Sequence, residues 1–491
     1  MNQSQDMNTD RAEIERAFQA TRAELGIRTG FPAEALREAE QVAHERRPDA
    51  TSHPLDCTEI PFVTIDPPGS RDLDQAVHAE RRGAGYRVRY AIADVGYFVD
   101  RGGALEREAW QRGTTFYAPD HREPLYPPVL SEAAASLLAD ELRPSVLCTL
   151  DLDGEGTLTG TAVERARVRS RAQLTYGDLL EHVERNGESE AAGTPSAETL
   201  ELLGEIGEKR LRIESERGGV SLPIRDQHVE QRAAEALGYE LSYEEPNPAE
   251  QWNAQISLLT GHAAALRMVE AGVGLLRTVA PTRSQELREF RLASQALGFD
   301  WPKDRSYAEF IREVDVAHPD IEVLIWQARR VMKGARYLAF HGEPPPDAEH
   351  AALAMLYSHC TAPLRRLGDR YVLDLLLRLA RGEMPDADEI ATLSELPAAL
   401  EAAQQKGRRL ERVVVNLAEA WTLRGREGES FPAVVLDVRP ERIEVQIDDP
   451  PVRTRIERRN GLPPVTPGDR IEVRLRAVET AAARVDFELV S

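Results

Sequence analysis

Three aspartates, Asp66, Asp72 and Asp74, follow the apolar run Val63-Thr64-Ile65. Carboxylate oxygens are hard ligands that suit Mg²⁺ or Mn²⁺, and three carboxylates in one short loop repel each other unless a cation neutralises them. The apolar run predicts a buried strand that ends at Asp66, and Gly69 allows the chain to fold back, so the acids would lie at the end of this strand. The spacing alone favours a solvated acidic loop, with a divalent-metal site as the alternative.

A second segment, from Tyr357 to Arg370, changes this balance. Residues 361–369 read Thr-Ala-Pro-Leu-Arg-Arg-Leu-Gly-Asp. Together with the aspartate loop, this segment resembles the ribonuclease II family (the ribonuclease II and ribonuclease R type of exoribonuclease). In that family a Thr-Ser-Pro-Ile-Arg-Arg-Tyr-Ala-Asp type segment meets an aspartate loop of the same spacing across the active site. The resemblance extends to residues 112–120, 137–144 and 431–490, so it covers nearly everything after residue 50.

The resemblance implies a two-metal phosphodiesterase. Asp66, Asp72 and Asp74 would hold two divalent ions, Mg²⁺ or Mn²⁺, that activate a water and stabilise the leaving 3′ oxygen. Asp74 would be the most sensitive of the three, because it orients the attacking water. Arg365 would stabilise charge on the scissile phosphate, since its guanidinium is permanently charged and suits bidentate contact with phosphate oxygens. The alternative for Arg365 is a simple ion pair with Asp369, four residues later on a predicted helix.

Aromatic and cationic side chains are the implied RNA contacts. Tyr117 and Tyr176 match positions that stack on or guide bases in the family, and stacking suits an enzyme that reads no sequence, because every base has a π face. For Tyr176 an ordinary core tyrosine is the competing interpretation. Arg366 joins Arg365 as an implied RNA-binding cation.

The sequence departs from the family at Gln75, where many members carry a fourth aspartate. A glutamine carbonyl can bind a hard cation but adds no charge, so we expect weaker binding of the second ion. We also predict that Gln75→Asp lowers the Mg²⁺ concentration needed for half activity. A second departure lies in front of the aspartate loop, where bacterial relatives carry two cold-shock barrels. Because this stretch is short and helical here, we expect RNA to reach the core through a different entrance.

The elements that must position these residues predict an α+β fold. Residues 1–58 form a small helical module, whose amphipathic helices at 10–26 and 32–43 build either a helix-turn-helix or a packing hairpin. Residues 59–428 form a large mixed catalytic domain of antiparallel sheets plus helices.

The C-terminal residues 429–491 predict an OB-fold β-barrel. At least four β patterns recur there, at 431–438, 441–448, 470–478 and 482–490. The family carries an RNA-binding barrel in this position, and such barrels bind oligonucleotides on an open face. A barrel that only caps the core is the alternative.

The charge of the chain argues against a simple nucleic-acid binder. It has 83 acidic and 61 basic side chains, a formal net charge of −22, whereas such binders present a basic surface to phosphates. A nuclease needs cations only along its RNA path, however. One candidate cluster is Arg329, Lys333 and Arg336 on a predicted helix, and another lies at 406–412. Each cluster alone indicates a solvated helix face.

Targeting and redox features are few. No apolar run approaches the roughly 18 residues of a membrane helix, and the polar N-terminal residues do not resemble a signal peptide, so we expect a cytoplasmic protein with no membrane partner. Cys57, Cys148 and Cys360 are widely spaced and odd in number, which indicates neither a disulfide framework nor a zinc site.

These observations predict a 3′ to 5′ exoribonuclease that hydrolyses single-stranded RNA to nucleoside 5′-monophosphates. The resemblance supplies the direction and the products. One alternative is a catalytically silent RNA-binding protein of the same fold, in which Gln75 disables the site. The other is a metal-dependent phosphoesterase that acts on small nucleotides. No protein partner is indicated.

Overall fold

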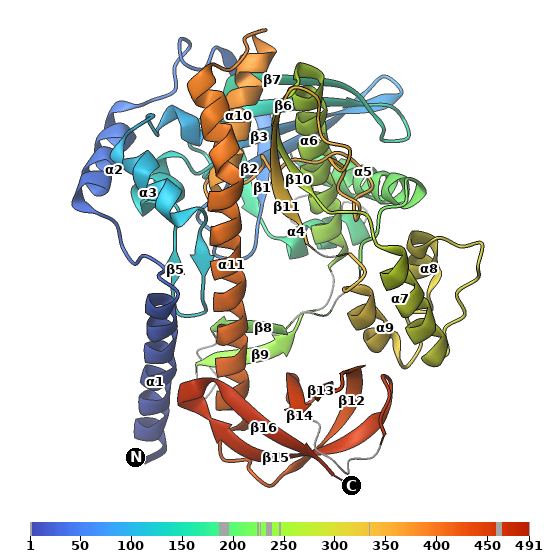
Figure 1. Ribbon diagram of the computed structural model, residues 1–491. Helices are drawn as coiled ribbons and strands as arrows, with labels where there is room; N and C mark the ends of the chain where they lie inside the picture. The colour runs from blue at the N-terminus through green and yellow to red at the C-terminus, as the bar shows by residue number, and fades with distance from the viewer. Residues whose placement is uncertain are drawn as a thin grey trace.

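The computed structural model describes residues 2–185, 196–222, 225, 227–231, 238–244, 247–332, 334–457 and 464–490. A mixed core of strands and helices lies above a separate C-terminal β-barrel, and the long helix α11 (Ala387–Leu423) runs from one to the other (Figure 1). The predicted α+β fold is therefore confirmed. Within the described residues, no helix is long and apolar enough to cross a membrane.

A closed five-stranded barrel forms the centre of the core. Its strands are β1 (Leu55–Ile65), β2 (Gln75–Arg82), β3 (Gly85–Ala93), β6 (Arg143–Leu152) and β7 (Leu158–Leu174). The predicted antiparallel pairing is found, and one parallel pair, β1 with β7, closes the barrel. Fully buried side chains such as Val63, Val88 and Leu150 form its core. The aspartate loop connects β1 to β2, so it leaves the barrel at the end of β1.

Helices and two short two-stranded sheets surround this barrel. They are α3 (Ala104–Arg112), α4 (Tyr176–Glu184), α5 (Ala197–Glu216), α6 (Pro248–Ala271), α10 (Leu367–Ala380), the pair β4 (Phe116–Tyr117) and β5 (Arg122–Glu123), and the pair β10 (Val273–Thr278) and β11 (Arg336–His341). Helix α5 packs on β2, and α10 packs on β7 and α6. The apolar positions of α10 recur at helical spacing, at Leu367, Tyr371 and Leu375, which gives it one face for this packing.

The N-terminal helices pack on different parts of the chain. Helix α1 (Asn2–Glu24) contacts α11 and places Phe18 edge-to-face on Tyr239 of the hairpin β8 (Gln227–Gln231) and β9 (Tyr239–Tyr243). Helix α2 (Ala33–Glu45) packs on α3, well away from α1 (Figure 1). The two helices therefore form neither a helix-turn-helix nor a hairpin, and β1 begins at Leu55, inside the predicted N-terminal module 1–58.

Three short helices beside the C-terminal barrel share a core of their own. They are α7 (Ser284–Ala296), α8 (Tyr307–Glu313) and α9 (Ile321–Ala328). Phe290, Trp301 and Phe310 contact one another in this core, and Leu436 of the barrel joins it. The helix predicted to carry Arg329 and Arg336 on one face ends at Ala328, so that prediction is wrong; Arg336 begins β11, and Lys333 lies outside the described residues.

The C-terminal barrel has five antiparallel strands in the order β14-β13-β12-β15-β16. They are β12 (Ser430–Val438), β13 (Arg442–Ile447), β14 (Val452–Glu457), β15 (Arg470–Glu479) and β16 (Arg484–Leu489). The edge strands β14 and β16 lie next to each other, so the sheet nearly closes. Leu417 and Trp421 of α11 share the apolar core of this barrel, which fixes it to the end of the helix. Strand β14 was not among the predicted patterns.

Candidate active site

Asp74 joins the two segments that sequence analysis singled out. It is fully buried, and its Oδ2 accepts a hydrogen bond from Arg365 Nε at 2.7 Å. Its Oδ1 accepts a second bond from the backbone N–H of Leu364, also at 2.7 Å. Burial raises the pKa of Asp74 to about 7, although Arg365 and the N–H group of Leu364 oppose this rise. Asp74 therefore holds both the backbone and the guanidinium of the second segment.

Arg365 is the cation at the centre of the site. Burial opposes its charge, but Asp74, Tyr117 and Asp72 together raise the pKa of Arg365 above its ordinary value. Its side chain remains 39% exposed, so part of the guanidinium reaches solvent. The group is thus permanently charged and accessible to an anion.

Asp72 also lies close to this cation. Its Oδ1 accepts a hydrogen bond from Arg122 Nη1 at 2.6 Å, and its Oδ2 accepts one from the hydroxyl of Tyr117 at 3.2 Å. Tyr117 is 52% exposed, which leaves its ring face open to a ligand. Arg122 also contacts Glu132. Sequence analysis missed Arg122, which lies two residues beyond the similar stretch 112–120.

Asp66 and Tyr176 come together at the end of β1. The N–H group of Asp66 donates to the carbonyl of Leu174, which fixes the start of the aspartate loop against β7. Burial raises the pKa of Asp66 to about 6, Arg365 lowers it and Asp72 raises it further. Tyr176 is the first residue of α4, and burial together with the charge of Asp66 raises its pKa. The predicted residues Asp66, Asp72 and Tyr176 therefore lie around the same space.

Gln75 has a structural partner at each end of its amide. Its Nε2 donates to the carbonyl of Thr361 at 2.6 Å, and its Oε1 accepts from the hydroxyl of Tyr90 at 3.2 Å. The amide thereby links the start of β2 to the segment that carries Arg365. The expectation that Gln75 serves as a weak metal ligand has no support in this arrangement.

Asp369 pairs with Arg366 and not with Arg365. Its Oδ2 accepts bonds from Arg366 Nη2 at 2.7 Å and from the N–H group of Ala362 at 2.8 Å. The alternative prediction of an Arg365–Asp369 ion pair is wrong, because Arg365 precedes α10 and turns to Asp74 instead. Arg366, which was predicted to bind RNA, instead forms an ion pair with Asp369 that stabilises its own loop.

The segment 113–115 binds the backbone carbonyl group of Arg365. The hydroxyl of Thr114 and the N–H group of Thr115 both donate to the Arg365 carbonyl, at 2.8 and 2.9 Å. The N–H group of Leu367 donates to the carbonyl of Gly113 at 3.1 Å. Sequence analysis included residues 113–115 in the similar stretch 112–120 but gave them no role, since backbone bonds of this kind leave no signal in residue type.

The carboxylates of the site determine whether a metal ion fits it. Among the described residues, no three acidic, histidine or cysteine side chains come together as a group able to hold an ion. Both oxygens of Asp74 face protein donors, and so do those of Asp72. The raised pKa of Asp66, caused by burial and by Asp72, marks negative charge that a cation would relieve. Hard carboxylate donors are thus present, but the predicted set of three ligands stays a prediction.

Comparison with known proteins gives two family matches. Residues 55–382 match the model of the RNB domain, and residues 429–490 match the RNase II-type exonuclease C-terminal S1 domain. Ribonuclease R of Escherichia coli is 27% identical over 499 residues, which cover 94% of this chain and 60% of that protein. Ribonuclease R of Aquifex aeolicus is 26% identical over 492 residues, which cover 94% of this chain and 68% of that protein. The chain thus spans only 60% of the length of the Escherichia coli relative.

Solved structures share the fold. Mycoplasma genitalium RNase R in complex with ribose methylated single-stranded RNA has a TM-score of 0.85 at 18% identity, covering 96% of this chain and 77% of that chain. Yeast Ssd1, a pseudonuclease, has a TM-score of 0.66 at 17% identity, covering 84% of this chain and 51% of that chain. At such identities the likeness shows the fold alone.

Proposed function

We infer the function from one premise, that the chain belongs to the RNB domain family, whose matched residues contain both halves of the candidate site. We propose that it is a 3′ to 5′ exoribonuclease that hydrolyses single-stranded RNA to nucleoside 5′-monophosphates. The observation that carries this proposal is the contact of Asp74 with both Arg365 and Leu364. It brings a carboxylate and an exposed cation together at the end of β1.

Arg365 binds and polarises the scissile phosphate. Asp74 takes its Nε, so the terminal nitrogens of the guanidinium are left for phosphate oxygens. Because the position of the guanidinium is fixed before RNA arrives, charge that develops on the phosphate meets an oriented donor without a cost of reorganisation. Asp74 in this role keeps Arg365 in place and supplies negative charge beside the attacking water.

In this proposal a divalent ion, Mg²⁺ or Mn²⁺, would complete the site. Asp66 and Asp72 would hold it, and a second ion would involve Asp74 together with substrate phosphate. When bound, such ions supply an activated water and neutralise charge on the leaving oxygen. Burial of Asp66 beside Asp72 supports this assignment, since a cation would offset the repulsion of the two carboxylates.

The exposure of two tyrosine side chains indicates how they would contact RNA. The half-exposed ring of Tyr117, bonded through its hydroxyl to Asp72, is suited to stack on a base next to the reacting phosphate. Tyr176 lies near Asp66 and guides the terminal nucleotide. Single-stranded RNA as the substrate is consistent with the Mycoplasma genitalium RNase R complex, which holds single-stranded RNA on the same fold.

The proposal is tested by digestion of a 5′-labelled single-stranded RNA with Mg²⁺ titrated. We expect the label to move down a ladder from the 3′ end, with metal-dependent release of 5′-monophosphates that Asp74→Asn abolishes. Asp56→Asn, at a surface ion pair with Arg167 outside the site, is the matched control and should act like the unaltered protein.

Two outcomes point elsewhere. Binding without cleavage across a broad range of metal concentration would favour a silent RNA-binding protein, an alternative kept open because a pseudonuclease shares the fold. Cleavage that is indifferent to polymer length would favour a phosphoesterase that acts on small nucleotides.

A further inference from the structure

The β4–β5 hairpin carries two side chains of the candidate site, yet it is too short to be stable alone. Each of its strands has two residues, and even a longer two-stranded hairpin is only marginally stable by itself. The cross-strand partners Tyr117 and Arg122 both donate to the carboxylate of Asp72, at 3.2 and 2.6 Å. Whatever holds this hairpin therefore decides where two groups of the site lie.

Helix α1 covers the other face of the hairpin. Successive residues of a strand point to opposite faces, so Phe116 and its cross-strand partner Glu123 point away from Asp72. Both are buried, and Phe116 shares an apolar core with Ile14 and Phe18 of α1. The hairpin thus lies between α1 and the aspartate loop.

Arg22, in the last turn of α1, joins the helix to the tip of the hairpin. Its Nη1 and Nη2 donate to Oδ1 and Oδ2 of Asp120, each at 2.7 Å, which makes a bidentate pair. The side chains of Arg22 and Asp120 are only 4% and 8% exposed, so water screens the pair little. Asp120 lies in the turn of the hairpin, and moving the turn away would leave a buried charge without its partner.

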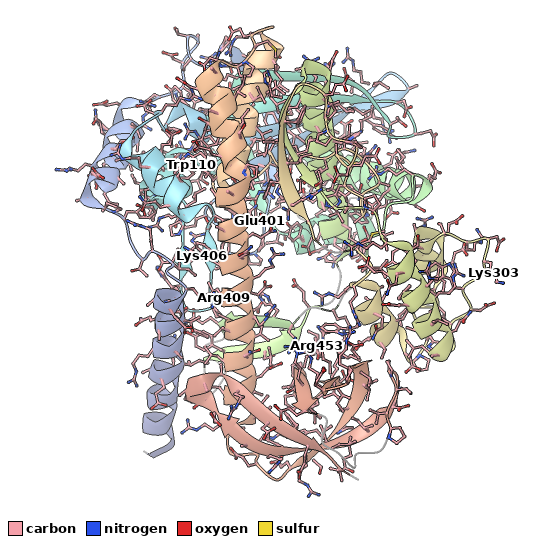
Figure 2. The ribbon with its side chains drawn as sticks, in the orientation of Figure 1. Trp110, Lys303, Glu401, Lys406, Arg409 and Arg453 are labelled. Atoms are coloured by element: carbon pink, nitrogen blue, oxygen red, sulfur yellow. The ribbon has the colours of Figure 1, made fainter. Side chains whose placement is uncertain are left out.

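The end of α1 is itself fixed to the core of the molecule. Lys406, on the side of α11 that faces α1 (Figure 2), donates to the carbonyl of Gly26 at 3.3 Å. Arg28 Nε donates to Glu108 of α3 at 3.0 Å. Because α1 is held by two helices of the core, a contact made by Arg22 can hold the hairpin in turn.

We propose that Arg22 is a positioning residue of the site, whose ion pair with Asp120 holds the β4–β5 hairpin so that its two site residues stay on Asp72. Arg22 acts in this role only through the hairpin. The inference rests on the proposed function for the reaction to be measured, whereas the hold on the hairpin is independent of it. It assigns helix α1 to the active site, although α1 lies outside the residues 55–382 that match the RNB domain.

The first measurement follows the hairpin without RNA or metal, by amide hydrogen exchange of residues 113–125 in the full chain. Arg22→Met keeps the apolar stem and removes the charge. The control is Arg87→Met, because Arg87 makes a bidentate pair with Asp151 at 2.7 and 2.9 Å elsewhere on the five-stranded barrel. We expect Arg22→Met to speed exchange of the segment about tenfold or more, and Arg87→Met to leave it unchanged. Exchange that is unchanged in Arg22→Met overturns the proposal.

The second measurement is kcat/KM for a 5′-labelled single-stranded RNA. We expect Arg22→Met to lower kcat/KM about tenfold, because small displacements of positioned groups are costly. Arg22→Lys keeps the charge but not the bidentate geometry, so it should restore part of the loss. Asp120→Asn breaks the pair from the hairpin side while α1 stays unaltered, and it should act like Arg22→Met in both measurements. Arg87→Met should leave kcat/KM unchanged.

A double-mutant cycle separates positioning from a general loss of stability. With Tyr117→Leu and Arg122→Gln combined, the hairpin has no polar side chain left on Asp72, so Arg22→Met should lower kcat/KM by less than about twofold further. A chain that is merely destabilised would show the full loss in both backgrounds, and that result overturns the proposal. If the unaltered chain does not hydrolyse RNA, the proposed function fails, while hydrogen exchange still decides whether Arg22 holds the hairpin.

Discussion

Asp74 is the residue at which the two halves of the candidate site meet, and it accepts bonds through both oxygens. In Asp74→Asn one oxygen becomes an amino group that faces either Arg365 or the N–H group of Leu364, both of which are donors. We expect kcat to fall by about 10³-fold or more, with RNA affinity changed by less than about threefold. Single-turnover hydrolysis and anisotropy measure the two quantities. A loss of affinity as large as the loss of kcat would mean that the loop has collapsed.

For substitution of Gln75, the hydrogen bonds of its amide and the charge at the metal site predict different effects on activity. Its amide donates to the carbonyl of Thr361, and an aspartate is shorter and cannot donate. We now expect Gln75→Asp and Gln75→Ala to lower kcat alike, by about tenfold, because each leaves a half-buried carbonyl unpaired. Neither should lower the Mg²⁺ concentration needed for half activity. If the aspartate variant alone lowers that concentration, residue 75 contacts the metal and the structural role is secondary.

At the scale of the residue, sequence reasoning named side chains that lie close together in the fold, but it paired Arg365 with the wrong acid. Asp74, Arg365 and Tyr117 could be named because their motifs are distinctive. The pairing of Arg365 with Asp369 assumed that both lie on one helix, where residues four apart are neighbours. Helix α10 begins only at Leu367, so Arg365 is free to turn to a loop far away in the sequence. Where a helix begins decides this pair, and the start of a helix is poorly fixed by pattern alone.

At the scale of the element, the segment after α3 is held against α11 by a glycine. Gly113 ends α3 with φ of 73°, and a β-carbon there would lie 2.6 Å from Cβ of Ala403. Gly102 has φ of 72° with open space around it, so it is the matched control. We expect Gly102→Ala to cost about 1 kcal/mol of stability from backbone strain alone, and Gly113→Ala to cost about 1–3 kcal/mol more from the collision.

Activity should separate the same two variants. The segment 113–115 binds the backbone of Arg365, so a shift of Gly113 moves Arg365, the proposed phosphate-binding cation. We therefore expect Gly113→Ala to lower kcat measurably and Gly102→Ala to leave it unchanged. Equal effects of the two substitutions on both unfolding and kcat would show that α11 yields without disturbing the site.

The junction of α11 with the barrel predicts a pH dependence. Glu419 is buried, and it accepts bonds from Gln227 Nε2 and from the N–H group of Arg453. Burial raises its pKa to about 7, against these bonds and the charge of Arg453. Between about pH 4 and pH 7 the folded chain thus keeps a proton that the unfolded chain has lost. Stability contributed at this position therefore falls as the pH rises through that window.

Substitution of Glu419 tests the direction of this pH dependence. Glu419→Gln keeps an oxygen for both donors but cannot ionise, so its free energy of unfolding relative to the unaltered chain should rise with pH. The difference should reach about 3 kcal/mol above pH 7. Urea unfolding at several pH values measures it, with Glu401→Gln on the exposed face of α11 as the control. A difference that stays constant with pH would mean that Glu419 is ionised throughout.

The sequence predicts which helices and strands form better than it predicts which of them pack together. The apolar face of α1 was visible in its spacing, yet spacing does not say that this face covers α11 and the β8–β9 hairpin while α2 covers α3. The parallel pair of β1 and β7 was also beyond reach, because it joins strands about a hundred residues apart and no turn sets its register. The sequence pattern predicts that a face is buried, whereas the topology decides which element covers that face.

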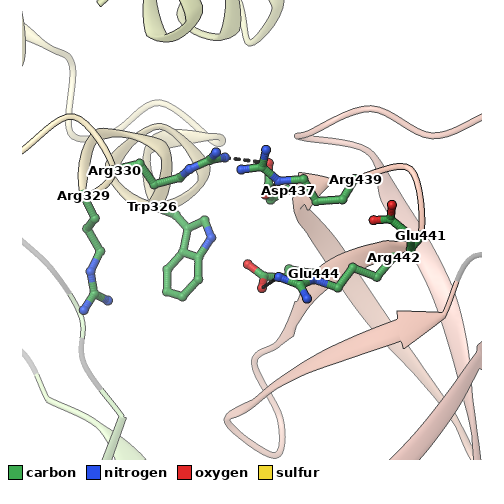
Figure 3. Close-up of a pocket in the computed structure, with 8 residues that line it drawn as sticks. All are labelled: Trp326, Arg329, Arg330, Asp437, Arg439, Glu441, Arg442 and Glu444. Carbon is green, nitrogen blue, oxygen red and sulfur yellow. Dashed lines mark hydrogen bonds and ion pairs between the residues drawn. The ribbon is translucent and has the colours of Figure 1, made fainter. Parts of the chain in front are cut away.

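At the scale of the whole molecule, the barrel, α9 and α11 act as one unit. Apolar residues of α11 enter the core of the barrel, and Leu436 of the barrel enters the core of the α7–α9 helices. The domain boundary near residue 429 is thus a boundary in sequence more than in packing. Motifs along the chain could suggest an RNA-binding barrel, but they could not show that helix α9 of the preceding domain packs on it (Figure 3).

The separation of charge in this molecule leads to a prediction about salt. The chain carries a net charge of −22, so the proposed RNA substrate would be repelled at long range and held only where arginines such as Arg365 reach solvent. If about 5 phosphates contact these cations, release of counterions should weaken binding of a long single strand roughly 100-fold as KCl rises from about 50 to about 200 mM. Anisotropy in the absence of metal measures this slope. An affinity that is independent of salt would leave Arg365 without a phosphate to bind, and stacking alone would then have to account for the complex.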